Sequence, residues 1–421
     1  MTPEIKQRIE QIRRGEVPEG YVKKRKVVIP QQWGLPQIKD IASISSGSTP
    51  NRNNSEYWNG NIAWVTTGEL SSGHVNHTSE LITVKAVKET KMRIYPQGTL
   101  LIAMYGQGKT RGTVAILEID AAVNQACAAI TVKDGKSKFL FYQLKNSYQD
   151  IRKLSNTGNQ ENLNADIIKT YQVPWAPDEE QERISTILTT QDKVIKLKEK
   201  RLAEKQRQKK YLMQQLLTGK KRLPGFSEEW KKVKIGSFIK EIDERSTVNN
   251  QHEILSVTKN GMVFQSSHFN KQIASENNVG YKVVRRGNLA FSTMNLWMGS
   301  LDTLRICDTG IVSPAYKVFE FNQSLIVVNF AENYMKSAEM IWLYKANSEQ
   351  GASIVRRNLD LQALLNSEVA LPDISEQTAI AEVISAADHE IDLLRQDIEQ
   401  EKQKKKALMQ LLLTGIVRVT I

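Results

Sequence analysis

The segment AMYGQGKTRG, residues 103–112, carries the side chains that come closest to a known chemical motif. Gly108, Lys109 and Thr110 follow one another as at the end of a phosphate-binding loop, where backbone amides and a lysine hold nucleotide phosphates. That loop also needs a glycine at position 103, which is alanine here, and a helix afterwards, whereas RGTVAILEID predicts a strand. We therefore interpret this segment as a flexible glycine-rich loop whose Lys109 and Arg111 suit contact with a DNA backbone.

Acidic and histidine side chains are the next candidates, and neither group predicts catalysis. Residues 178–180, Asp-Glu-Glu, could form a nuclease carboxylate cluster, but they open a predicted helix, where acids interact favourably with the helix dipole. His74 and His77 lie in a loop of Ser, Gly and Asn without nearby cysteine or supporting acids. We interpret them as polar loop residues and not as metal ligands.

Motifs for methyl transfer and for nucleophilic catalysis are missing from the sequence. No glycine fingerprint for a methyl-donor cofactor follows a predicted strand, and there is no Asn-Pro-Pro or Asp-Pro-Pro triplet. No Ser or Cys lies in a nucleophile elbow. Cys127 and Cys307 are far apart, which fits a reducing cytosol and predicts neither a disulfide nor structural zinc. We expect no catalytic site, cofactor or metal in this chain.

Composition indicates a chain of more than one domain with a polyanionic partner. Its 421 residues suggest two or three domains, and 58 Lys and Arg against 46 Asp and Glu give a net charge of +12. An unspecialised basic enzyme remains an alternative explanation of the charge. No apolar run approaches the roughly 18 residues of a membrane span, and the N-terminus is charged where a signal peptide is apolar. We expect a cytoplasmic protein with no membrane partner.

An internal repeat organises the chain. The segments 177–219 and 373–415 align without a gap at an offset of 196, and both end in Leu-Leu-Thr-Gly. The offset pairs Asp192 with Asp388 and Lys209 with Lys405. The parts before these segments also match: Trp33 pairs with Trp230 at an offset of 197, and residues 123–127, VNQAC, match 312–316, VSPAY, at 189. The plan is therefore domain, helix, domain, helix.

Apolar residues recur every three or four positions through both repeated segments, which predicts two long helices that pair along one seam. About 40 residues at 1.5 Å each give roughly 60 Å, the length of a spacer. Residues 177–222 carry 13 basic and 7 acidic side chains, and residues 373–418 carry 6 and 9, so the two helices have opposite net charges. Polar residues within the seam leave open the alternative of two solvated helices that never meet. The apolar seam residues are Ile184, Leu188, Ile195, Leu202, Leu212 and Leu216 in the first helix and Ile380, Ile384, Ile391, Leu394, Ile398, Leu408 and Leu412 in the second.

Short runs rich in Val, Ile and aromatic residues, separated by Gly, Asn and Ser, predict mixed α/β domains before each helix. The runs include NIAWVTT, TLLIAMY, TVAILEI and AAITV in the first domain and EILSV, NLAFSTM and IVSPAYKVFEF in the second. The predicted parts are a basic helical extension with a loop near Pro18 and Gly20 at 1–30, a first domain at 31–172, a central helix at 173–222, a second domain at 223–369 and a distal helix at 370–421.

Two divergent domains, each followed by a long helix ending in the same phrase, resemble the specificity subunits of type I restriction-modification systems. Residues 44–70, ISSGSTPNRNNSEYWNGNIAWVTTGEL, look like the opening of a target recognition domain of that family, and residues 223–238, LPGFSEEWKKVKIGSF, look like the start of a second. The resemblance covers essentially the whole chain. It implies an α+β fold in which two pseudo-repeated mixed α/β target recognition domains are joined and separated by two long antiparallel helices that form a coiled coil.

The resemblance also implies a function. Such a subunit reads a bipartite sequence of double-stranded DNA, one half per recognition domain, and docks DNA methyltransferase subunits, two per chain, through the long helices. S-adenosylmethionine, ATP and Mg would then belong to the methyltransferase and restriction motor subunits. The second domain departs from the family pattern because it lacks the Gly-Ser-Thr-Pro phrase and reads IKEIDERSTVNNQHEILSVTKNG instead.

Reading bases requires side chains such as Arg, Lys, Asn and Gln on loops that reach the major groove, while phosphate contacts supply affinity. The DNA-binding candidates chosen on this basis are Thr49, Arg52, Asn53, Thr67, Gln107, Lys109, Arg111, Asn124 and Gln125 in the first domain and Lys259, Asn260, Arg285, Arg286, Asn295 and Trp297 in the second.

Two other classes of function stay open. A self-sufficient DNA-modifying enzyme would label DNA with a methyl donor in the absence of other subunits, which the missing motifs argue against. A structural coiled-coil protein would bridge partners without reading a sequence. Apolar helix positions that face away from the seam would be partner surfaces, and we expect the isolated chain to aggregate if they are left uncovered.

Overall fold

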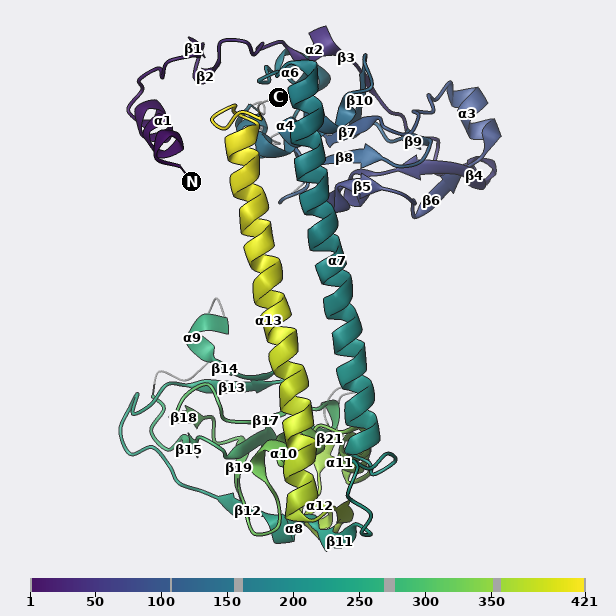
Figure 1. The fold of residues 1–421 in the computed structure, drawn as a ribbon. Coiled ribbons are helices and arrows are strands. Elements are labelled where there is room, and N and C mark those ends of the chain that lie inside the picture. The colour runs from purple at the N-terminus through teal and green to yellow at the C-terminus, as the bar shows by residue number, and fades with distance from the viewer. Residues whose placement is uncertain (1, 107, 155–161, 269–276, 351–356, 420–421) are drawn as a thin grey trace. The chain divides into compact units, whose positions relative to one another are not determined.

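The computed structural model describes residues 2–106, 108–154, 162–268, 277–350 and 357–419. The chain forms two compact units, unit 1 from Met1–Lys198 and Asp397–Ile421 and unit 2 from Glu199–Gln396 (Figure 1). Each unit therefore combines one mixed domain with one half of each long helix. Within the described ranges, no helix is both long enough and apolar enough to cross a membrane.

Unit 1 is built on a five-stranded sheet of order β3-β10-β7-β8-β5. Its strands are β3 (Ala42–Ser46), β10 (Cys127–Val132), β7 (Leu100–Ala103), β8 (Val114–Leu117) and β5 (His74–Val75). Both faces of this sheet are covered, so β7 is apolar throughout: Leu100 and Ile102 belong to one core cluster and Leu101 and Ala103 to another. The first cluster also contains Phe139 and the start of the long helix, and it joins the domain to that helix.

A second, three-stranded sheet of order β6-β4-β9 extends unit 1. It consists of β6 (Glu80–Ile82), β4 (Trp58–Val65) and β9 (Ala121–Val123). The remaining elements of the domain are α2 (Ile38–Ile41), η1 (Ser55–Tyr57), η2 (Thr67–Ser72), α3 (Val84–Thr90), α4 (Ser137–Asn146), α5 (Tyr148–Lys153) and α6 (Ala165–Thr170).

The N-terminal extension contains α1 (Pro3–Arg13), then the expected loop around Pro18 and Gly20, and then a hairpin of β1 (Tyr21–Lys24) and β2 (Val27–Pro30), which the sequence did not predict. The hairpin is stabilised by contacts that are distant in sequence: the Tyr21 hydroxyl donates to the carbonyl of Gly415 at 2.7 Å. Arg8 likewise donates to the carbonyl of Ile416. The extension thus packs on the last residues of the chain, a contact that local sequence patterns do not reveal.

Unit 2 has a four-stranded sheet of order β12-β19-β16-β17. Its strands are β12 (Ile239–Ile242), β19 (Tyr316–Phe321), β16 (Leu289–Ser292) and β17 (Leu301–Thr303). The predicted run 311–321 is divided by a turn, because β18 (Thr309–Val312) leaves the main sheet and pairs with β15 (Lys282–Arg285).

Smaller elements complete unit 2. They are β11 (Lys231–Lys234), α8 (Ile235–Phe238), β13 (Leu255–Thr258), β14 (Gly261–Phe264), α9 (Gln265–His268), η3 (Leu296–Met298), α10 (Val328–Tyr334), α11 (Ala338–Ala346), β20 (Ser348–Gln350), β21 (Arg357–Leu359), α12 (Leu361–Asn366) and β22 (Glu368–Leu371).

The two domains share one sheet plan. In each, a strand that follows a short helix lies at the edge (β3 or β12), next to the last strand of the domain's core (β10 or β19), then to the central strand (β7 or β16) and its hairpin partner (β8 or β17). The repeat found in the sequence is therefore also a repeat of topology, and differences between the domains fall mainly in the connections.

The long helices are α7 (Asp178–Leu216) and α13 (Ile374–Leu412), of 39 residues each, and they pack antiparallel. Each is followed by a glycine with positive φ, Gly219 at 67° and Gly415 at 71°, the backbone conformation that commonly ends a helix. The α+β class with two pseudo-repeated domains and two antiparallel helices is confirmed.

The predicted seam residues fall into two groups. Those at the helix ends pack into the domain cores: Ile184, Leu188 and Leu412 into unit 1, and Leu216, Ile380 and Ile384 into unit 2, with Leu408 and Leu212 partly buried beside them. Those in the middle are Ile195 and Ile398 in unit 1 and Ile391, Leu394 and half-buried Leu202 in unit 2. The seam is therefore short, and the domain cores hold the helix ends.

The polar residues that interrupt the apolar pattern of the seam form ion pairs and hydrogen bonds between the two long helices. In unit 1 Lys405 bonds to Asp192 at 2.5 Å, and in unit 2 Lys209 bonds to Asp388 at 2.5 Å, so the two pairs are related by the offset of 196. Glu401 accepts from Lys198 and from Gln191. These pairs specify the antiparallel register in each unit.

Candidate nucleic-acid interface

Loops from three connections of the first domain come together in unit 1, and we call them the unit 1 loop face: residues 47–54, residues 104–106 with 108–113, and residues 124–126. Ser48 N–H donates to the carbonyl of Val123 at 2.9 Å, and Met104 N–H donates to the carbonyl of Ala126 at 2.8 Å. Gly47 lies so close to the chain at Val123 that a Cβ there would overlap its carbonyl. The close backbone packing holds the three loops as one surface.

Several predicted DNA-binding residues meet on this face. The Thr49 hydroxyl donates to the Gln125 side chain, and Asn124 N–H donates to the carbonyl of Val65. Gln125 and Asn53 are exposed, whereas Thr49, Thr67 and Asn124 are half-buried. Gln107 lies outside the described residues.

Arg52 is held in an aromatic cage that the sequence did not reveal. Its guanidinium lies 4.2 Å from the ring centre of Trp58 and 5.0 Å from that of Trp64, and it pairs with Glu80. The hydrogen bonds between them raise the pKa of Arg52 and lower that of Glu80. Arg52 therefore fixes the 47–54 loop, and only part of its charge is available to a ligand. The aromatic Trp58 in the phrase SEYWNGN was the available signal.

Lys109 and Arg111 differ in accessibility although they are two residues apart. Lys109 is exposed, and its carbonyl accepts from the Tyr148 hydroxyl at 2.7 Å, which anchors the loop. The Arg111 side chain is only 7% exposed. Lys109 is thus the presented cation of this loop, and Arg111 lies inward.

The second-domain candidates fall at opposite ends of one strand. Arg285 and Arg286 precede β16 and form ion pairs with Glu244 and Asp308, respectively. Asn295 and Trp297 follow β16 in the connection to β17, where the Arg357 guanidinium lies 5.9 Å from the Trp297 ring centre. The structure therefore does not bring these two pairs together.

Lys259 and Asn260 are exposed in the turn between β13 and β14. The same hairpin is tied to β17, because Met262 N–H donates to Asp302 at 2.7 Å.

Topology identifies which connections of the two domains correspond. The loop after β7, with Lys109, corresponds to the connection after β16, with Asn295 and Trp297. The segment after β3, residues 47–54, corresponds to residues 243–250 after β12, which the sequence-based selection missed. The signal was present, because Asn53-Asn54 and Asn249-Asn250 are 196 residues apart.

A second set of residues missed in the sequence joins the helix ends to the domains. In unit 1 Glu180 accepts from Trp33 Nε1 at 2.8 Å and from Arg418 Nε at 2.8 Å. In unit 2 the same contacts link Glu376 to Trp230 and Arg222. We call these the Trp-Glu-Arg nodes.

Burial alone would raise the pKa of Glu180, but the hydrogen bonds from Arg418 and Trp33 outweigh burial and lower it. This acid therefore has a structural role beyond its favourable place in the helix dipole. The expectation of a loop without a supporting acid is wrong for His74, which begins β5 and bonds to Glu118, 44 residues away, at 2.8 Å; His77 bonds to its neighbour Asn76.

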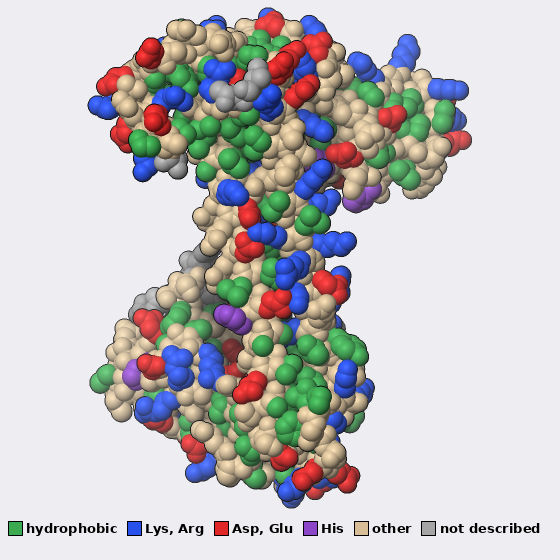
Figure 2. Space-filling view, viewed as in Figure 1, with side chains coloured by type: hydrophobic (Ala, Val, Ile, Leu, Met, Phe, Trp, Pro, Cys, Tyr) green, Lys and Arg blue, Asp and Glu red, His purple; other side chains and the backbone are tan. Residues whose placement is uncertain are grey.

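Charge on the molecular surface is mixed. In Figure 2, Lys and Arg side chains are interleaved with Asp and Glu on the face in view and do not gather in one basic patch. Lys109 in unit 1 and Lys259 in unit 2 are exposed cations on loops.

Comparison with known proteins agrees with this architecture. Residues 30–206 match the sequence model of the family described as type I restriction modification DNA specificity domain. The type I restriction enzyme MjaIX specificity subunit of Methanocaldococcus jannaschii is 34% identical over 178 residues, which span 41% of this chain and only 40% of that relative. The MjaVIII specificity subunit of the same organism is 24% identical over 93% of this chain and 94% of its own length.

Solved structures extend the likeness to the whole fold. The S subunit of a type I restriction-modification system from M. genitalium aligns with a TM-score of 0.51 at 13% identity, over 93% of this chain and 98% of that chain. The HsdS subunit from Thermoanaerobacter tengcongensis aligns with a TM-score of 0.51 at 14% identity, over 92% and 98%.

Two mixed-sheet domains on a pair of antiparallel helices are the fold that this chain shares with those solved S and HsdS subunits. Residues 30–206 match the type I restriction modification DNA specificity domain family, and over nearly its whole length the chain is similar to specificity (S) subunits of type I restriction-modification systems. This family is non-catalytic, in agreement with the prediction that the chain is not an enzyme.

Proposed function

We propose that this subunit reads a bipartite target in double-stranded DNA, one half-site per recognition domain. The observation that carries the proposal is the shared sheet plan with different connections: β3-β10-β7-β8 and β12-β19-β16-β17 are equivalent, yet the loop after β7 contains Lys109 and Arg111, whereas the loop after β16, residues 293–300, contains no Lys or Arg. Equivalent scaffolds that present different side chains suit two different half-sites.

Candidate readers are assigned by accessibility. In unit 1, exposed Asn53 and Gln125 are placed to contact base edges and Lys109 to contact phosphate. In unit 2, Asn295 is the base-contact candidate and Lys259 the phosphate candidate. Arg52, Arg285 and Arg286 are engaged with carboxylates, which supports a role in positioning loops.

The long helices are proposed to dock two methyltransferase subunits. Apolar side chains exposed on them support this role: Leu197 is 66% exposed in unit 1, and Tyr211 and Leu393 are 56% and 50% exposed in unit 2. The methyltransferase subunits would bind S-adenosylmethionine, and restriction motor subunits would use ATP and Mg. The complex would act in the cytoplasm, and domain boundaries at 31–172 and 223–369 are proposed for the recognition domains.

The test is methylome sequencing of a host that expresses the methyltransferase subunit with and without this chain. A split adenine-methylated motif that requires the chain supports target reading. The matched control replaces exposed Asp134, in the turn after β10 and outside both the unit 1 loop face and the long helices, by alanine and is expected to leave the motif unchanged. A methylome that is the same with and without the chain contradicts the proposal and favours a bridging protein that reads no sequence.

A further inference from the structure

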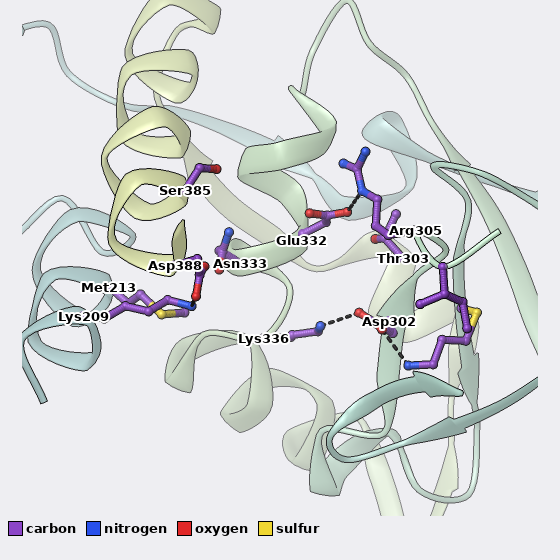
Figure 3. A pocket seen from close by; sticks show the side chains of 12 residues that line it. Lys209, Met213, Asp302, Thr303, Arg305, Glu332, Asn333, Lys336, Ser385 and Asp388 are labelled. Carbon is purple, nitrogen blue, oxygen red and sulfur yellow. Dashed lines mark hydrogen bonds and ion pairs between the residues drawn. The ribbon is translucent and has the colours of Figure 1, made fainter. Parts of the chain in front are cut away.

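A polar pocket of about 420 Å³ lies within unit 2, between the two long helices, α10 and β17 (Figure 3). Three ion pairs border it: Lys209 with Asp388, Lys336 with Asp302, and Arg305 with Glu332. Its wall also contains the hydroxyl of Thr303, a residue only 2% exposed, and no described residue forms a hydrogen bond with that hydroxyl.

The internal repeat shows what fills the corresponding place in unit 1. Residues 138–145 of α4, KFLFYQLK, align at an offset of 191 with residues 329–336, NFAENYMK, which comprise most of α10 and the two residues after it. Side-chain contacts support this alignment: Gln143 donates to the carbonyl of Pro174, and Tyr334 donates to the carbonyl of Ala370, the residue 196 positions later. Tyr142 therefore corresponds to Asn333.

Tyr142 occupies the place in unit 1 that is open in unit 2. Its hydroxyl donates to Oδ2 of Asp192 at 2.8 Å, and Lys405, which bonds to Oδ1 of the same carboxylate, lies 5.4 Å from its ring centre. In unit 2, Lys209 bonds to Oδ1 of Asp388 in the same way. No described residue donates to Oδ2 of Asp388, and Asn333 is too short to fill the space where the phenol would lie.

The surroundings favour a polypeptide over a small molecule. A second pocket of about 500 Å³, lined mainly by apolar atoms, shares Met213 and Lys336 with the first and continues along the end of α7. Lys210 and Lys220 also line it. An occupant that follows both pockets would place an aromatic residue at Asp388 and meet several cations beyond it.

We propose that the unit 2 pocket receives a tyrosine side chain of a partner protein, whose hydroxyl donates to Asp388 as Tyr142 donates to Asp192, with acidic residues beside the tyrosine facing Lys210 and Lys220. The inference rests on the proposed docking of a partner on the helices. It makes the two ends of the subunit unequal: unit 1 supplies its own tyrosine, and unit 2 takes one from outside.

Ligand-observed NMR on the purified full chain tests the pocket directly, with N-acetyl-tyrosinamide as the probe. Asn333→Tyr should abolish binding by filling the space from within, while Gln323→Tyr, at an exposed position, should not. N-acetyl-phenylalaninamide should bind about tenfold more weakly, because it cannot donate to the carboxylate. Equal binding of the two probes to the parent chain, or undiminished binding to a folded Asn333→Tyr chain, overturns the proposal.

Native mass spectrometry of the complex with methyltransferase subunits then separates this inference from the proposed function. Two methyltransferase subunits on the parent and on Gln323→Tyr, with one of the two bound more weakly on Asn333→Tyr, support both proposals. Equal occupancy of both sites on Asn333→Tyr and on the parent at every concentration would contradict the proposal that a partner tyrosine enters the pocket. No association with the parent chain would contradict the proposed docking, and the NMR result would still decide whether the pocket binds a phenol.

Discussion

The first and second domains differ far more in what they present than in how they are attached. Both have the same four-strand order, a Trp-Glu-Arg node at the helix ends and an Asp-Lys pair across the helices. By contrast, the connection after β7 contains Gly106, Gly108 and Gly112, and that after β16 contains Trp297 beneath Arg357. The attachment to the helices is therefore the same in both domains, whereas the loops after β7 and β16 differ.

The Trp-Glu-Arg nodes explain why substitutions where a domain joins the long helices should be costly. Glu376 has a side chain that is 1% exposed, and it bonds to both Arg222 and Trp230. Changing any one of the three residues leaves buried polar groups without partners, whereas a change at an exposed loop residue such as Lys109 costs the fold little. The comparison therefore predicts large stability effects at the nodes and effects on recognition in the loops.

The largest expected effect is on stability. Glu376→Ala should destabilise unit 2 by about 3–5 kcal/mol, since removing one member of a buried charge pair strands the other. Glu180→Ala should act in the same direction on unit 1 but less strongly, because Arg418 also bonds to Gln32. Urea unfolding followed by near-ultraviolet circular dichroism measures both. The control, exposed Glu182→Ala, should change the free energy of unfolding by no more than about 0.5 kcal/mol. If Glu376→Ala were as stable as this control, the node would have no structural role.

Changes in base reading come next. In the methyltransferase complex, Gln125→Ala should relax base choice in one half of the target and Asn295→Ala in the other, each by about 1–3 kcal/mol of discrimination. Methylated motifs from hosts that carry each variant give the measurement. If both variants altered the same half-site, the assignment of one half-site per domain would be wrong.

A smaller effect is expected from a phosphate contact. Lys109→Ala should weaken DNA binding for all sequences alike and reduce the salt slope by about 1, without a new target preference. Arg111→Ala should also lower affinity, together with stability, because its side chain lies inside the domain. Fluorescence anisotropy of the complex at several salt concentrations checks this, with Lys259→Ala as the unit 2 counterpart. Unchanged binding in both Lys109→Ala and Arg111→Ala would remove this loop from the interface.

The smallest effect concerns pH. Hydrogen bonds from Lys198 and Gln191 lower the pKa of Glu401 from 4.5 to about 2. Since the lowered pKa belongs to the folded state, its stabilising effect is complete above pH 4.5 and is lost as the pH falls toward 2. Between pH 4.5 and 2, the melting temperature of Glu401→Gln should therefore fall less with pH than that of the parent chain. The melting temperature of exposed Glu382→Gln should fall as much as that of the parent chain. An unchanged profile for Glu401→Gln would show that the pair does not contribute.

The sequence predicted the architecture because the helices and the repeat are periodic. Offsets of 196 and the terminal Thr-Gly phrases located both long helices, and alternating apolar runs located the central strands. Two local features were wrong in detail: residues 21–30 form a hairpin, and residues 313–315 interrupt the run 311–321. The first depends on the distant carbonyl of Gly415, and the second on Pro314 at a turn.

The candidate interface was less accessible to sequence reasoning, because residue type does not reveal partners. Arg52, Arg285 and Arg286 were chosen as cations, yet each faces a carboxylate, 28 residues away in the sequence for Arg52. The segment 243–250 was overlooked, since only the strand order shows that it corresponds to residues 47–54. Which of these side chains contact DNA stays a prediction.

Unit 2 is one uninterrupted stretch, Glu199–Gln396, whereas unit 1 also needs Asp397–Ile421. During synthesis from the N-terminus, all of unit 2 leaves the ribosome before unit 1 has its last segment. Tyr21 and Glu180 must wait for Gly415 and Arg418, their partners from the end of the chain. The domain that comes first in the gene is thus the last to be completed, and a chain that terminates early leaves unit 1 open.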